Sequence, residues 1–143
     1  MMPGRKQPSL SEWTLVLMEG NGVLFTSKER GIAPLLECLE RFAGHTGRCT
    51  LHDRVTGLAA ARLTVLSGFI AEVVTRVVST PAQAFLTQHG IKITSEVIVP
   101  RIFNRNKTGL CPAETIALQT EDPQEMIVLL SGLRPPSPHP AKT

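Results

Sequence analysis

The cysteine at position 111 is the side chain in this sequence that is best placed for chemistry. Cys111 precedes Pro112, which is typical of a first helical turn, and Glu114 would then lie one turn inside that helix. The first N–H groups of a helix have no intrahelical partner and favour negative charge. A thiol there favours the thiolate, the form of cysteine that attacks electrophiles and binds metals. We therefore expect Cys111 to be a nucleophile and Glu114 its acid–base partner.

Both residues also have a simple structural interpretation. A free cysteine is often a small buried residue, so Cys111 can equally well pack against apolar side chains where a helix starts. A carboxylate such as Glu114 in a first helical turn is favourable without any catalytic role. Exposure of the thiol decides between these alternatives.

Asp53 is the third candidate for a catalytic role, as a base or as the residue that orients a ligand hydroxyl. It precedes an apolar run with small residues, so its simpler role is to cap a helix that runs to Gly68. Further candidates for ligand binding lie at expected helix starts and in the basic loop before Cys111. They are Thr56, Ser79, Thr80, Arg101, Asn104, Arg105, Lys107, Thr108 and Gly109.

Alternating strand and helix patterns predict the elements that carry these residues. Residues 12–19 and 23–26 form a hairpin around Gly20-Asn21-Gly22, because such turns need residues that tolerate positive φ. Apolar periodicity predicts helices at 32–42, after Asp53, and at 81–89, 112–119 and 123–133, with Asp122 as the cap of the last. Strands are expected at 49–51, 72–78 and 91–99. The order is β-β-α-β-α-β-α-β-α-α, which favours a mixed sheet covered on both faces.

The composition fits one compact α/β domain at residues 11–133. The chain has 143 residues, of which 42% are hydrophobic, and a net charge of +3. Its basic residues are spread along the chain without interleaved aromatic residues, so a nucleic-acid partner is not expected. Residues 1–10 are polar, and residues 134–143 contain four prolines, so we expect both ends to be disordered.

The three cysteines and the lack of an apolar leader indicate a cytoplasmic protein without a membrane span. Cys38, Cys49 and Cys111 have no CxxC spacing, which suits a reducing compartment. No local group of ligands has the spacing of a zinc site, so neither a metal nor another cofactor is expected.

Three motifs together resemble a small prokaryotic family, domain of unknown function 1893, over roughly residues 11–133. They are Asp53-Arg54-Val55-Thr56-Gly57-Leu58-Ala59-Ala60-Ala61, Ser79-Thr80-Pro81-Ala82 and Asn104-Arg105-Asn106-Lys107-Thr108-Gly109-Leu110-Cys111-Pro112. The resemblance implies a fold similar to cytidine deaminases, a three-layer αβα sandwich with a mixed sheet. Deaminases place a His or Cys and two further cysteines at two helix starts. The helix starts expected here at Asp53 and Ser79 carry no such set, so deaminase chemistry is not implied.

Two functions stay open from the sequence. The first is a small-molecule site for a nucleotide-like or anionic ligand, formed where strands lead into helices, with Cys111 as its reactive group. The alternative is a non-catalytic module that senses a ligand or assembles as a homo-oligomer.

Overall fold

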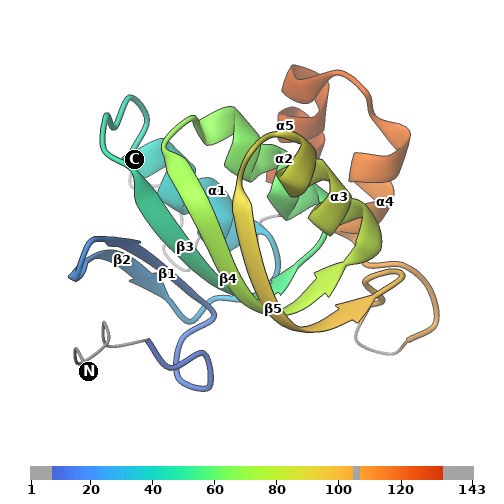
Figure 1. Cartoon of the computed structure of the whole chain (residues 1–143). Helices are drawn as coiled ribbons and strands as arrows, with labels where there is room; N and C mark the ends of the chain where they lie inside the picture. The colour runs from blue at the N-terminus through green and yellow to red at the C-terminus, as the bar shows by residue number, and fades with distance from the viewer. Residues whose placement is uncertain (1–7, 105–106, 134–143) are drawn as a thin grey trace, which may run out of the picture.

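The chain forms a mixed sheet of five strands with helices packed on it (Figure 1). The computed structural model describes residues 8–104 and 107–133. Its elements are β1 (Leu15–Glu19), β2 (Gly22–Ser27), α1 (Ala33–Arg41), β3 (Cys49–Thr56), α2 (Leu58–Ser67), β4 (Ile70–Ser79), α3 (Thr80–Gln88), β5 (Lys92–Val99), α4 (Pro112–Gln119) and α5 (Pro123–Ser131). The predicted order of strands and helices is therefore confirmed, and so is the α/β class.

The sheet order is β2-β1-β3-β4-β5, and the opening hairpin supplies its antiparallel part. β1 pairs antiparallel with both β2 and β3, whereas β3, β4 and β5 are parallel. The hairpin turn includes Gly20 at φ +60°, the left-handed conformation that favours glycine. Leu15, Val16, Leu17 and Met18 are all buried, so β1 lies in the middle of the core rather than at its edge.

The helices α1, α2 and α3 pack on one face of the sheet, which differs from the expected αβα sandwich. α2 packs against β3 and β4 and lies between α1 and α3, while α4 and α5 join this group through α2 and each other (Figure 1). Parallel crossovers are right-handed, and β3 to β4 to β5 step in one direction, so α2 and α3 must share a face. On the opposite face of the sheet, Thr50, Glu72 and Lys92 follow one another across three strands.

Asp53 does not cap a helix, contrary to the sequence-based expectation. It lies inside β3, where it pairs with Leu15 of β1 and Thr75 of β4, and the helix starts only after Gly57. Residues 49–51 are thus the beginning of an eight-residue strand rather than the whole of it. The helix-start motif Asp53-Arg54-Val55 is therefore strand, since pairing on both sides outweighs a local capping signal.

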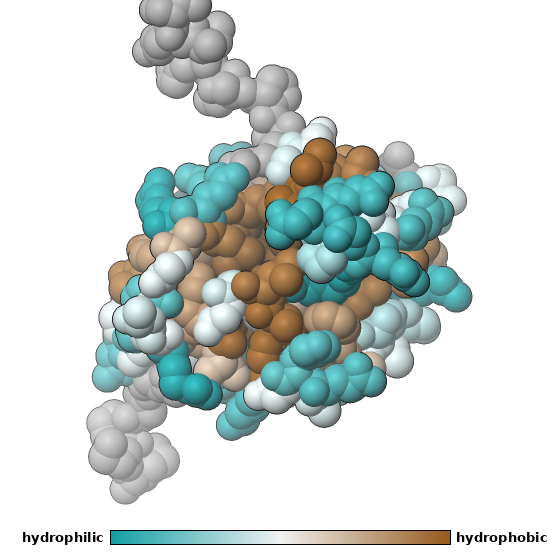
Figure 2. Space-filling model, turned by 90° about the horizontal axis from the view of Figure 1, so that it is seen from above, coloured by the Kyte–Doolittle hydropathy of each residue, from teal (hydrophilic) through white to brown (hydrophobic). Residues whose placement is uncertain are grey.

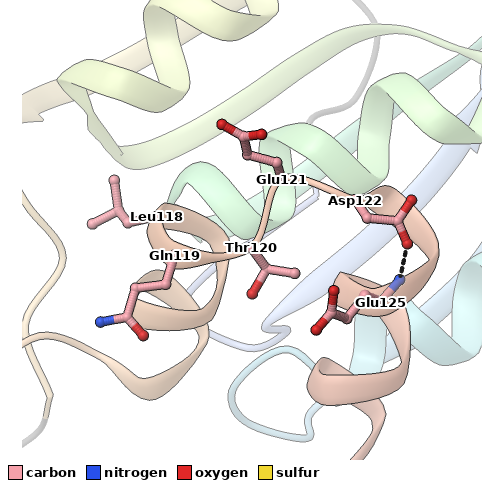
Figure 3. Close-up of a pocket in the computed structure, with 6 residues that line it drawn as sticks. All are labelled: Leu118, Gln119, Thr120, Glu121, Asp122 and Glu125. Atoms are coloured by element: carbon pink, nitrogen blue, oxygen red, sulfur yellow. Dashed lines mark hydrogen bonds between the residues drawn. The ribbon is translucent and has the colours of Figure 1, made fainter.

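Two other predicted caps are present. The Ser79 hydroxyl accepts a hydrogen bond from the Ala82 N–H at the start of α3. At the start of α5, Asp122 Oδ2 accepts one from the Glu125 N–H over 2.9 Å, the dashed line of Figure 3. Each cap satisfies an N–H group that has no partner within its own helix.

The surface of the described chain carries several exposed apolar side chains. Val128 is 70% exposed on α5, and Leu66 and Leu129 are also exposed. The view from above in Figure 2 shows apolar surface broken up by hydrophilic groups at the end where β3, β4 and β5 begin. The exposed apolar side chains do not form one continuous surface in this view, so a homo-oligomer stays a prediction.

None of the described helices has the length and apolar character to cross a membrane. Disorder is expected for residues 1–10 and 134–143; of these, residues 8–10 are described, where the Leu10 carbonyl accepts a hydrogen bond from Arg54, and the others lie outside the described residues.

α2 and α4 are joined at both of their ends, and Arg62 makes one of these connections. The Arg62 guanidinium donates hydrogen bonds to the carbonyl oxygens of Ala117, Thr120 and Glu121, at 3.0, 2.6 and 2.8 Å. These carbonyls lie at the end of α4, where unpaired oxygens and the helix dipole favour a cation. A charge on α2 thus completes the C-terminus of α4.

We predict that Arg62→Ala lowers the free energy of unfolding by about 2–3 kcal/mol, because it removes charged hydrogen bonds to partly buried carbonyls. Arg62→Lys should lose less than Arg62→Ala, because it keeps the positive charge, but more than nothing, since a lysine reaches fewer carbonyls at once. Urea unfolding measures both. The control is Arg76→Ala, which changes an exposed arginine of β4 and should stay within about 0.5 kcal/mol of the unmodified protein. Equal stability of the Arg62→Ala and Arg76→Ala variants would contradict this role.

Candidate functional site

A cavity of about 640 Å³ lies at the carboxyl end of β3, where the starts of α1, α2 and α4 meet. Four separate segments line it: the start of β1, the turn into α1, the β3–α2 junction and the loop that leads into α4. The lining residues include Arg30, Asp53, Gly57, Ile102, Cys111 and Glu114. All three residues that the sequence suggested for catalysis therefore border one space, although they come from distant parts of the chain.

Asp53 supplies a carboxyl group that faces this cavity from β3. Burial raises its pKa from 3.8 to about 7, although hydrogen bonds from the backbone N–H groups of Arg54 and Val55 lower it in part. The side chain is enclosed by protein yet keeps some contact with solvent through the cavity. A carboxyl group that titrates near neutral pH can both donate and accept a proton there.

Glu114 uses one oxygen to hold the start of α2. Its Oε1 accepts a hydrogen bond from the Leu58 N–H at 2.7 Å, and its side chain is 2% exposed. Burial raises the pKa of Glu114, while the Leu58 N–H, the Ser79 hydroxyl and the Ala59 N–H favour its charged form and lower it. Gly57 offers no side chain to cap α2, so a carboxylate from α4 caps it instead. Glu114 therefore stabilises a helix start, as its structural interpretation expects, but the helix is α2 rather than its own helix α4.

Two buried oxygens beside Gly57 have no hydrogen-bond partner among the described residues. They are Oε2 of Glu114 and Oγ1 of Thr56, and Thr56 is fully buried at the end of β3. The Ser79 hydroxyl accepts from the Ala82 N–H, so its own O–H proton stays available to donate, and it lowers the pKa of Glu114. Unsatisfied buried oxygens are uncommon in native proteins, so each is a position where a water or ligand group can donate a hydrogen bond.

Cys111 is the N-cap residue of α4 and is half-buried at the cavity. Its N–H donates to the Ile102 carbonyl at 2.9 Å, and its carbonyl accepts from the Thr115 N–H at 3.0 Å. These bonds fix the backbone at the helix start. Cys38 and Cys49 are buried in the core, and burial together with the neighbouring Cys49 raises the pKa of Cys38 to about 12.

The candidate ligand-binding residues divide into two groups. Asn104 lines the cavity, although its side chain also closes the loop by hydrogen bonds with Thr108. Thr56 and Ser79 are buried and do not line the cavity, and Ser79 caps α3. Arg105 lies outside the described residues. The other candidates are exposed or partly exposed and do not line the cavity: Thr80, Arg101, Lys107, Thr108 and Gly109.

Two arginines at the cavity were not predicted from the sequence. Arg30 is exposed at the turn into α1. Arg54 donates to the carbonyls of Leu10, Ser11 and Trp13, so its charge anchors the segment before β1. No local motif marks Arg30, because its place at the site depends on how α1 packs beside α2.

A second hollow, at the connection between α4 and α5, is a weaker candidate. Its lining comes from one short stretch, residues 118–125, and it is wide open to solvent. Figure 3 shows that the carboxylates of Glu121, Asp122 and Glu125 point in different directions, and Asp122 is engaged as the cap of α5. This hollow gathers no converging set of groups.

We predict that Gly57→Ala destabilises the protein by about 1–3 kcal/mol. A Cβ at this position would lie 2.5 Å from Oε1 of Glu114 and 3.2 Å from Ile102, so the carboxylate must leave the α2 terminus. Gly109→Ala is the matched control, because a Cβ there meets no atom within 4 Å. Thermal unfolding compares the two, and an equal effect of both changes would contradict the close packing of Glu114 on Gly57.

We also predict that Asp53→Asn becomes more stable relative to the unmodified protein as pH rises from about 4 to 7. The native pKa of Asp53 is raised, so unfolded chains lose this proton first and the stability of the unmodified protein falls across that window. Asparagine removes this loss, which amounts to at most about 4 kcal/mol. Urea unfolding at several pH values measures the difference. Glu114 also makes the free energy of unfolding fall with pH, and it does so in both proteins, so the informative quantity is the difference in that free energy between them. If this difference does not change with pH, the raised pKa of Asp53 is refuted.

The comparisons with known proteins concern the family and the fold. The family model described as TM1506, domain of unknown function (DUF1893), matches residues 7–133. The fold is similar to the crystal structure of a DUF1893 family protein, TM1506, from Thermotoga maritima, with a TM-score of 0.72 and 24% identity over 86% of this chain and 82% of that chain. No curated protein matches the chain. From the family model, which covers most of its length, the chain belongs to the DUF1893 (TM1506) family.

Proposed function

We propose that this protein binds a small nucleotide-like or anionic molecule in the cavity at the carboxyl end of β3, with Cys111 as its reactive group. The observation that carries the proposal is the convergence of Asp53, Cys111 and Glu114 on one cavity from two separate segments of the chain. Its volume lies within the range of small-molecule sites, about 300–1,000 Å³. Its lining is mostly apolar with a few polar groups, as such sites require.

The charges at the cavity favour particular parts of a ligand. Asp53 is suited to accept hydrogen bonds from an amine or hydroxyl group, such as those of a base or a sugar. Arg30 at the rim is suited to a phosphate or carboxylate, because its guanidinium offers several parallel N–H donors. The start of α2 is closed to an anion, since the Glu114 carboxylate already occupies it.

Asp53 and Cys111 together support an acid–base and nucleophile pair. Asp53 has a pKa of about 7, which lets it take up a proton at neutral pH. The Cys111 thiol lies at the start of α4 and borders the cavity, and a thiol is a nucleophile once it loses its proton. A bound molecule between them would have a nucleophile on one side and a proton acceptor on the other.

The relation to cytidine deaminases is a proposal at the level of the fold. The opening hairpin and the mixed five-stranded sheet support it, whereas the packing of α1, α2 and α3 on one face of the sheet does not. Zinc-dependent deamination has no support at this cavity, because the described residues of its lining contain one cysteine and no histidine, fewer donors than the deaminase motif requires.

A non-catalytic ligand-binding module is the second candidate, and the position of Glu114 favours it. This carboxylate is engaged in holding α2, so Glu114 does not act as an acid–base partner of Cys111. Under this alternative the cavity still binds a ligand, but the Cys111 thiol has no special reactivity.

We predict that iodoacetamide labels Cys111 much faster than Cys38 and Cys49, because only Cys111 is accessible. Cytidine or adenosine 5′-monophosphate should slow the labelling of Cys111 in the folded protein, as followed by mass spectrometry of the peptides. Asp53→Asn should remove this protection, whereas Lys107→Ala should keep it, since Lys107 does not line the cavity.

Inorganic phosphate and an uncharged nucleoside, tested separately, show which part of the ligand matters. Equal and slow labelling of all three cysteines refutes a reactive Cys111. Protection by neither nucleotide, or equal protection in the Asp53→Asn variant, refutes the proposed binding site.

A further inference from the structure

The opposite end of the sheet holds a second group of chemically active side chains. Glu19 ends β1, His45 lies in the loop after α1, and Cys49 begins β3. The sequence predicts no metal site, because no local pair of its possible ligands has a spacing typical of zinc sites. In the structure, one carboxylate oxygen, one imidazole nitrogen and the thiol sulfur all lie within 4.8 Å of one another.

The geometry within this group is set by several contacts. His45 Nε2 lies 3.1 Å from Oε1 of Glu19. The His45 ring packs edge-on against Phe42 and Phe69, with ring centroids 6.1 and 5.6 Å away. The Cys49 N–H donates to the Phe69 carbonyl at 2.8 Å. Phe69 therefore packs against the imidazole of His45 and also holds the backbone of Cys49.

Gly47 leaves room for the three groups to converge. A Cβ at this position would overlap the Glu19 carboxylate and would lie 2.8 Å from Nε2 of His45. The backbone of the loop thus passes close to both polar groups. Any larger residue would push the carboxylate or the imidazole out of place.

We propose that Glu19, His45 and Cys49 form a binding site for a divalent transition-metal ion, with zinc as its preferred occupant. Thiolate, imidazole and carboxylate are the three donor types that zinc takes in proteins. A thiolate and an imidazole together disfavour magnesium and calcium, which bind oxygen ligands. The carboxylate and the thiolate would balance the charge of the ion.

The distances fit such an ion after a small adjustment of the side chains. Bonds of about 2.0–2.3 Å in a tetrahedron place ligand atoms about 3.3–3.8 Å apart. Nε2 of His45 and Oε1 of Glu19 are 3.1 Å apart, slightly below this range, and all three ligand atoms lie within 4.8 Å of one another. Three protein ligands leave a fourth position for water, and the partial exposure of Glu19 and His45 provides the entry path, while Cys49 is only 1% exposed.

This site is independent of the cavity, since it lies where β3 begins and the cavity lies where β3 ends (Figure 1). Failure of one proposal therefore leaves the other unaffected.

Titration of the metal-free full chain with Co²⁺ tests the proposal, because cobalt replaces zinc and gives a thiolate-to-metal charge-transfer band in the ultraviolet. We expect one Co²⁺ per chain with this band, displaced by Zn²⁺. Cys49→Ser should abolish the band, and Glu19→Gln and His45→Gln should each weaken binding at least about tenfold. Cys111→Ser and His89→Gln are the matched controls and should bind as the unmodified protein does.

Glu19 and His45 are partly exposed, so their variants are expected to fold even if Cys49→Ser does not. If Glu19→Gln and His45→Gln both keep the charge-transfer band and bind Co²⁺ with unchanged affinity, the proposed site is overturned. The loss of this band in Cys111→Ser, or its absence in the unmodified protein, would also overturn it.

Discussion

The fold around the cavity depends on one buried carboxylate. Glu114 of α4 completes the first turn of α2, and Arg62 of α2 completes the last turn of α4. Each helix therefore supplies the charge that the other helix's terminus favours. Leaving a buried charge without its partner is costly, so the two helices hold their register strongly. This arrangement sets the position of Cys111, which lies one turn before Glu114, relative to β3.

The same arrangement explains why α2 has no polar face. Ala59, Ala60 and Ala61 are buried, since the sheet, α1, α3 and α4 surround this helix. Small residues let the neighbouring elements approach closely, and Ala59 and Ala60 also leave space for the cavity. The walls of the cavity are therefore parts of the core, while its chemical groups come from strand ends and helix starts.

Much of the fold follows from local sequence signals, but the site follows only in part. The glycine turn, the Ser79 and Asp122 caps and the succession of strands and helices along the chain each rest on residues close together in the sequence, so they could be predicted. The prediction that Asp53 caps a helix was wrong. An aspartate before an apolar run is a cap signal, and the pairing of Asp53 with Leu15 and Thr75 cannot be read from neighbouring residues. Arg30 and the group of Glu19, His45 and Cys49 depend on long-range packing, which no spacing reveals.

Whether a ligand occupies the cavity can be seen in a crystal structure of the protein purified from cells, without added ligand. We expect electron density for a small molecule between Asp53 and Cys111, with a polar group on Asp53 and Glu114 still bound to the Leu58 N–H. A cavity filled by side chains, with Cys111 packed against apolar residues and no space beside Asp53, would contradict it.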